Sequence, residues 1–183
     1  MATITTRNTF LQRLIGAISL DAAVYEDVEA DVTATGQALI VVLLSSLAAG
    51  LGAPGLGGVT PASIAFISIV ALLLWAAWAM VTFEIGVRLM PQPQTRSDVG
   101  ELLRTTGFAS APGLLRIFGV LPGVTIPVFA LTAVWMLAAM IVAVRQALDY
   151  TSTGRAIAVC VLGWALALAL AVGIGLVFGP ALS

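Results

Sequence analysis

A few charged side chains at the ends of long apolar runs are the residues of this sequence that could do chemistry. The candidate interaction residues are Glu84, Arg88, Arg104, Arg116, Arg145 and Asp149. A charge at membrane depth is costly unless it is paired, so such residues are functional candidates by default. The alternative is structural, because arginine at the end of a span can reach the lipid headgroups and tie helix ends together. We expect Glu84 to pair with Arg104 or Arg145, with Arg88 as the local competitor four residues on.

Arg116 stands apart from the other charged residues. It interrupts an apolar run near that run's far end, and no acidic residue lies near it in the sequence. Guanidinium binds phosphate and carboxylate groups bidentately. We therefore expect its partner to be a lipid phosphate or the C-terminal carboxylate.

The sequence lacks the residues that most enzyme and metal sites need. It has no histidine, which excludes histidine-based triads and histidine-ligated zinc or haem. Its one cysteine, Cys160, lies inside an apolar run, where a thiol is expected to be inert. The stretches GVLPGV and GAPGLGG lack the lysine or acidic partners of a phosphate-binding loop. We expect no catalytic, cofactor-binding or metal site, and the net charge of -1 does not favour nucleic-acid binding.

Composition and run length predict an all-α bundle of membrane-spanning helices. Hydrophobic residues make up 60% of the chain, charged ones 9%, and the mean hydropathy is +1.09, whereas soluble domains carry about 25% charged residues. A helix needs about 20 mostly apolar residues to cross a bilayer. The predicted five spans are residues 36–52, 62–90, 105–121, 124–144 and 156–178.

The third of these runs is the least regular. It is short, and it contains Pro112 and Gly113. Proline removes a helical hydrogen bond and collides with the preceding turn, so we expect a kink or break near Ala111. A re-entrant segment is the alternative to a full span.

The N-terminal residues 1–32 are expected to form a cytoplasmic segment ahead of a transmembrane domain at residues 33–183. Phe10, Leu14 and Ile18 recur at four-residue spacing. This pattern indicates an amphipathic helix that lies in the membrane interface or docks on the bundle. The acidic stretch at residues 21–31 is interpreted as a solvated helix, with a divalent-cation site or a docking surface as alternatives.

The arginines predict the orientation of the bundle. With five spans and a cytoplasmic N-terminus, all arginines except Arg116 lie on the cytoplasmic side. The opposite orientation inverts this distribution, so the positive-inside rule favours a cytoplasmic N-terminus and an external C-terminus. A re-entrant third segment would place Arg145 and Arg155 outside, which argues against re-entry.

The last span carries a small residue at every fourth position. The stripe consists of Gly163, Ala167, Ala171 and Gly175. Small residues let a second helix approach closely where van der Waals packing must hold helices together. We favour packing within one chain over a dimer interface for this stripe.

Three segments are distinctive beyond their hydropathy, namely TGQAL, LLRTTGFASAPGLLRIFG and VWMLAAMIVAVRQALDYTSTGRAI. With the five spans and the polar N-terminal segment, they resemble bacterial members of the Yip family over about residues 8–178. The eukaryotic proteins of this family are five-pass membrane proteins that interact with Ypt/Rab GTPases in vesicle traffic. The resemblance implies a fold, a topology and a place in the bacterial inner membrane, and it supplies no catalytic residues.

The function expected from these features is a non-enzymatic integral membrane protein that organises the membrane or binds a partner. The alternative is a small transporter or channel with a site at the broken third span, near Arg116. A lipid-modifying enzyme ranks third, because the usual nucleophiles and bases are missing. The expected partners are membrane lipids, other membrane proteins or a second copy of the chain, and not nucleic acid.

Overall fold

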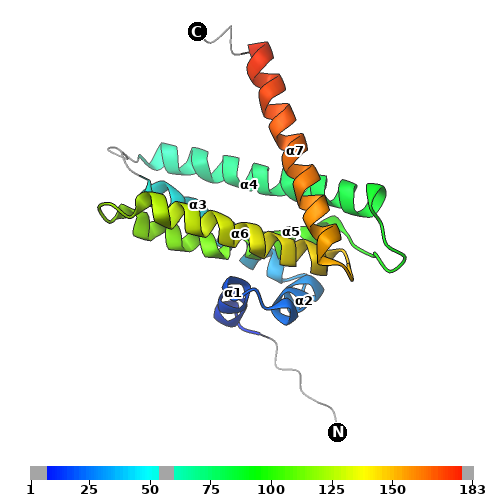
Figure 1. Cartoon of the computed structure of the whole chain (residues 1–183). Coiled ribbons are helices and arrows are strands. Elements are labelled where there is room, and N and C mark those ends of the chain that lie inside the picture. Colours follow the sequence, from blue (N-terminus) through cyan, green and yellow to red (C-terminus); the bar gives the residue numbers. More distant parts are fainter. Residues whose placement is uncertain (1–7, 54–59, 179–183) are drawn as a thin grey trace.

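The structure, a computed structural model, describes residues 8–53 and 60–178, and the secondary structure of these residues is entirely helical (Figure 1). In chain order, the elements are α1 (Phe10–Ile18), α2 (Ala22–Ala30), α3 (Ala34–Gly52), α4 (Pro61–Phe83), the π-helix η1 (Glu84–Leu89), α5 (Val99–Phe108), the 3-10 helix η2 (Ala111–Val120), α6 (Thr125–Ala147) and α7 (Thr153–Phe178).

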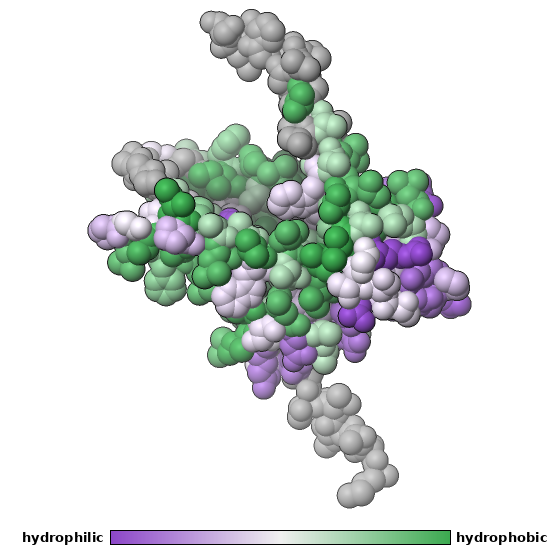
Figure 2. Space-filling model, viewed as in Figure 1, coloured by the Kyte–Doolittle hydropathy of each residue, from purple (hydrophilic) through white to green (hydrophobic). Residues whose placement is uncertain are grey.

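Three of the helical stretches within the described residues are long and apolar enough to cross a membrane. They are Ala34–Gly52, Ile64–Leu89 and Thr125–Ala147. Their outward-facing side chains are large and hydrophobic, and hydrophobic surface covers much of the molecule in Figure 2. A water-facing domain does not expose apolar surface on this scale, so the chain is an integral membrane protein.

The third predicted span is broken where the sequence predicts. Helix α5 ends at Phe108, and η2 begins at Ala111 with Pro112 in its first turn. Beyond the break the chain continues in the same direction, since Gly107 lies against Ala38, Gly113 against Ser45 and Gly119 against Gly52. The segment therefore runs parallel to α3 along most of its length and does not turn back.

The 3-10 geometry explains how residues 107–119 span the same length as the longer stretch Ala38–Gly52 of α3. The stretch from Ala38 to Gly52 covers about 21 Å as α-helix, whereas residues 107–119 would cover only about 18 Å in that form. A 3-10 helix rises about 2.0 Å per residue and has three residues per turn. The longer rise makes up the difference, and the six-residue spacing of Gly113 and Gly119 keeps both on the face that contacts α3.

The end of α4 carries an irregularity that the sequence analysis did not predict. The helix continues as the π-helix η1 and stops before Pro91 and Pro93. The Tyr150 hydroxyl lies 2.9 Å from the Gly86 carbonyl and 2.9 Å from the Met90 carbonyl. Arg155 donates to the carbonyls of Met90 and Pro91 at 3.2 and 3.1 Å. Side chains from the start of α7 and the link before it thus satisfy the carbonyls that the helix end leaves unpaired.

The N-terminal helices dock on the bundle, and the interpretation of residues 21–31 as a solvated helix is wrong. In α2, Val24, Tyr25 and Val28 are buried and share one hydrophobic cluster with Ala38 of α3 and Phe108 of α5. Helix α1 joins this cluster through the partly buried Phe10, Leu14 and Ile18. The four-residue pattern in α1 therefore marks a docking face, the second of the two alternatives for that helix.

Helix α7 packs on the bundle through its first half and then extends away from it (Figure 1). Gly163 is buried against the Trp78 ring of α4, so this part of the small-residue stripe serves packing within the chain. Ala167 is exposed. The side chains at Ala171 and Gly175 lie outside the described part of the structure.

Candidate functional site

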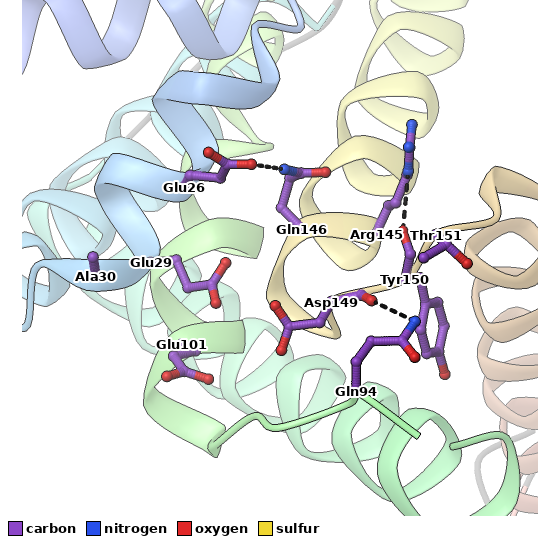
Figure 3. A pocket seen from close by; sticks show the side chains of 10 residues that line it. All are labelled: Glu26, Glu29, Ala30, Gln94, Glu101, Arg145, Gln146, Asp149, Tyr150 and Thr151. Carbon is purple, nitrogen blue, oxygen red and sulfur yellow. Dashed lines mark hydrogen bonds between the residues drawn. The ribbon is translucent and has the colours of Figure 1, made fainter. Parts of the chain in front are cut away.

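A cavity of about 740 Å³ opens at the end of the bundle where α3, α5 and α7 begin and α6 ends. We call this the arginine-rich end, because Arg13, Arg88, Arg96, Arg104, Arg145 and Arg155 lie in or beside its helix ends and loops. The cavity is bounded by α2, the loop before α5, α5 itself and the link between α6 and α7 (Figure 3). Its lining consists of Glu26, Glu29, Ala30, Gln94, Glu101, Arg145, Gln146, Asp149, Tyr150 and Thr151.

The lining is strongly acidic. Glu29 of α2, Glu101 of α5 and Asp149 after α6 come from three different elements and face the same space in Figure 3. The pKa of Glu29 is raised to about 7, first by partial burial and then by the negative charges of Glu101 and Asp149, against a smaller lowering effect of Arg104. Among the described residues, no group of His, Cys, Asp or Glu is placed to hold a metal ion.

Arg104 and Arg145 lie near these carboxylates, but both donate to backbone carbonyls. Arg104 is 5% exposed, and its Nε and Nη2 donate to the Glu29 carbonyl at 3.0 and 2.6 Å. It thereby caps the C-terminal end of α2, where a cation also complements the helix dipole. Arg145 donates from Nε to the Tyr150 carbonyl at 3.2 Å, and its guanidinium points away from the three carboxylates in Figure 3.

Polar contacts fix the loops around the cavity. Gln146 donates to Glu26 at 2.8 Å, which joins α6 to α2. Gln94 donates to the Asp149 carbonyl at 3.2 Å, and the Arg96 backbone amide donates to the Asp149 carboxylate at 3.3 Å. The loop before α5 is thus held against the link before α7, with the acidic cavity between them and α2.

The expected pairing of Glu84 with Arg104 or Arg145 is wrong. Glu84 forms its ion pair with Arg88, at 3.0 Å, and both side chains are exposed. Arg104 instead donates its hydrogen bonds to the Glu29 carbonyl at the end of α2. Sequence spacing does not reveal this acceptor. An exposed pair four residues apart contributes only about 0.3–0.5 kcal/mol, so Glu84 and Arg88 are not part of the cavity's architecture.

Arg116 lies at the opposite end of the bundle. Its Nε donates to Thr132 Oγ1 at 3.2 Å, and its guanidinium carbon is 5.4 Å from the centre of the Phe129 ring. Both contacts are with α6. Of the six candidate residues, the structure brings Arg104, Arg145 and Asp149 together around the acidic cavity, leaves Glu84 and Arg88 as an exposed pair and places Arg116 far from all of them.

A family model described as the Yip1 domain matches residues 19–174. The chain belongs to the Yip1 domain family. No curated protein and no solved structure matches the chain. The match begins before α2, so the docked acidic helix is part of the Yip1 domain rather than an appendage to it.

A buried ionic cluster that sequence reasoning missed links Arg13, which precedes the matched residues, to the Yip1 domain. The Arg13 side chain is 1% exposed and lies 2.8 Å from Asp27 and 2.8 Å from Asp31. Its Nη1 also donates to Gln37 at 3.1 Å. The one available signal was an arginine on α1 followed by an acidic stretch, but the sequence does not show that α1 and α2 fold back on one another.

Glu29→Gln is expected to stabilise the Yip1 domain above about pH 7, with a gain that disappears towards pH 4.5. The pKa of Glu29 is about 7 in the folded protein and 4.5 for a free glutamate, so the folded state holds more protons between these values and stability falls as pH rises. Thermal unfolding in one detergent across this pH range measures the effect. Glu84→Gln, which removes an exposed carboxylate outside the cavity, is the matched control. A Glu29→Gln protein with the wild-type pH profile would contradict the expectation.

Proposed function

We propose that this Yip1 domain protein is a non-enzymatic integral membrane protein that binds a basic segment of a partner protein at its acidic cavity. The observation that carries the proposal is the meeting of Glu26, Glu29, Glu101 and Asp149 around one open cavity. Like charges held close together are costly, and a cationic segment would offset that cost on binding. Binding through complementary charge would also favour a fast encounter that weakens with salt.

Two features of the chain support a binding role over an enzymatic one. The chain has no histidine, and its only cysteine is buried in α7, away from the cavity. The side chains of Glu26, Glu101 and Asp149 are held by hydrogen bonds, which suits recognition of a partner of defined shape. Membership of the Yip1 domain family is compatible with such a role.

Site-specific photo-crosslinking in cells tests the proposal. A crosslinking residue at Gln94, on the rim of the cavity, is expected to give discrete adducts, and one at the exposed Leu121 serves as the control at the opposite end. The combined variant Glu26→Gln, Glu101→Gln and Asp149→Asn should lose the adducts, whereas Glu84→Gln should keep them. Adducts that survive the combined variant, or that form equally from Leu121, would refute the cavity as the binding site.

We also propose five spans, with the N-terminus in the cytoplasm and the C-terminus outside, in a bacterial inner membrane. The parallel course of α5–η2 and α3 supports a full third span. The gathering of arginines at one end supports the orientation through the positive-inside rule. In a Cys160→Ala background, cysteines at Gln94 and at Leu121 are expected to react with impermeant reagents from opposite sides, and a cysteine at Ser183 should share the side of Leu121. Labelling of Gln94 and Leu121 from one side would rule out the third span.

The buried Pro112 and Gly113 do not support a transporter with its site at the broken third span, although Ser110, just before η2, lines a mostly apolar cavity together with Arg116. Pro112 and Gly113 are buried, and Gly113 packs against Ser45 and Met136 with no room for even one added carbon. A substrate site at a helix break requires unwound backbone that faces a cavity. We therefore do not propose transport through this break.

A further inference from the structure

A second cavity, of about 510 Å³, opens within the membrane-spanning region between α3, α4, η2 and α6. Its walls are mostly apolar side chains of α3 and α4, including Val42, Ala49, Phe66, Val70 and Leu74. Helix α4 packs on α3, α5 and α7 rather than on α6, and in Figure 2 the surface is hollowed between α4 and α6, with hydrophobic walls. The cavity is thus open sideways, where lipid tails would surround the protein.

Among the described residues that line this cavity, Arg116 is the only charged one. Within the described part of the chain, its guanidinium has one hydrogen-bond partner, Thr132 Oγ1, and no acidic partner. Guanidinium carries five N–H donors, so most of its donors are free to bind a ligand. A cation in the hydrocarbon region without a counter-ion is costly, and the Phe129 ring offsets only a small part of that cost.

Arg116 lies near the end of the bundle, beside the apolar wall that α4 contributes to the cavity. Thr132, which it contacts, lies about 10 Å along α6 from that helix's first residue, Thr125. The α4 side chains of the cavity, from Phe66 to Leu74, extend over about 12 Å of helix. A cation within two turns of the helix end, next to an apolar groove that reaches towards the middle of the bundle, matches a ligand with an anionic head and a hydrocarbon tail.

We propose that this cavity is a binding site for one anionic phospholipid, with its phosphate on Arg116 and an acyl chain along α4. No acidic residue is among the described residues that line the cavity, so these residues offer no partner to the ammonium of a zwitterionic headgroup. The site is therefore selective for net anionic lipids such as phosphatidylglycerol over phosphatidylcholine. It lies at the opposite end from the acidic cavity and does not depend on the proposed partner binding.

Native mass spectrometry of the detergent-purified protein, titrated with phosphatidylglycerol, tests the site. The wild-type protein is expected to bind one lipid tightly, and Arg116→Met to bind it about tenfold more weakly or worse, because charge-assisted hydrogen bonds are lost. Arg88→Met removes an exposed cation at the arginine-rich end and should bind as the wild type does. Ala71→Leu fills the groove while keeping Arg116, and it should also weaken binding.

Two further experiments test whether the ligand is a phospholipid or free phosphate, and whether Arg116→Met loses binding only because it misfolds. Inorganic phosphate should not raise the thermal stability of the wild-type protein, whereas phosphatidylglycerol should, because the acyl chain is needed for binding. Arg116→Lys keeps the charge and should retain part of the affinity if the phosphate contact is real. Equal lipid affinity in the wild type, Arg116→Met and Ala71→Leu would overturn the proposal, and so would stabilisation of the wild type by inorganic phosphate alone or equally by phosphatidylcholine.

Discussion

Gly52→Ala is expected to destabilise the protein by about 3 kcal/mol or more, the range of severe overpacking. A Cβ atom at position 52 would collide with the backbone carbonyl of Arg116, and it would lie 3.4 Å from the Phe129 ring. The collision is with backbone, so no change of rotamer can relieve it. Helix α3 and η2 would have to separate at the point where Gly119 also approaches Gly52, with only 2.6 Å between the Gly52 carbonyl and a Cβ built on Gly119.

Gly50→Ala is the matched control for this substitution. Gly50 lies on the same helix, two residues away, and a Cβ there would meet no atom within 4 Å. Alanine also has a higher helix propensity than glycine, so this variant should be as stable as the wild type or slightly more so. Thermal unfolding in one detergent, followed by the fraction that stays monodisperse, measures both variants. Equal stability of Gly52→Ala and Gly50→Ala would mean that α3 and η2 do not approach as closely as described.

The long spans were predictable because they depend on local composition. The runs at 36–52, 62–90 and 124–144 lie within two to three residues of the observed ends of α3, α4 with η1, and α6. No long-range contact is needed to make such a run helical in a membrane, since the backbone must satisfy its own hydrogen bonds there. The break before Ala111 was predictable for the same reason, because proline acts on its own turn.

The geometry beyond the break was not predictable from local rules. Pro112 predicts that the α-helix stops, but it does not predict that a ten-residue 3-10 helix follows. Such long 3-10 runs are uncommon on their own. The close glycine contacts with α3 are what stabilise this one, and those contacts join residues far apart in the sequence.

The acidic cavity and the buried cluster were missed for a related reason. Three of the six candidate residues, Arg104, Arg145 and Asp149, do lie beside the cavity, so charged span ends were a useful signal. Glu29 and Arg13 were not selected, because each acquires its role only when α1 and α2 fold back onto the bundle. Sequence spacing cannot indicate that Arg13 meets Gln37, 24 residues on.

Arg13→Met is expected to release α1 from the bundle. The almost fully buried Arg13 guanidinium forms ion pairs with Asp27 and Asp31 and donates a hydrogen bond to Gln37. Its Nη2 has no hydrogen-bond partner within the described part of the chain. Removing the cation takes the ion-pair partner from Asp31, a carboxylate that is 7% exposed and accepts hydrogen bonds from Thr33. Breaking a buried pair by removing one partner costs about 3–5 kcal/mol. Hydrogen exchange in α1 should therefore become fast, and limited proteolysis should cleave between α1 and α3.

Arg96→Met is the matched control, because Arg96 is exposed and its side chain makes none of these contacts. It removes the same charge at the same end of the bundle and should leave hydrogen exchange in α1 unchanged. The combined variant Arg13→Met, Asp27→Asn and Asp31→Asn should be more stable than Arg13→Met alone, since it removes the two negative charges that have lost their ion-pair partner. If the carboxamide substitutions instead add to the loss, the two aspartates stabilise α2 independently of Arg13. The N-terminal helices would then be held to the bundle by their hydrophobic face alone, through contacts such as the 6.3 Å edge packing of Phe10 on Phe108.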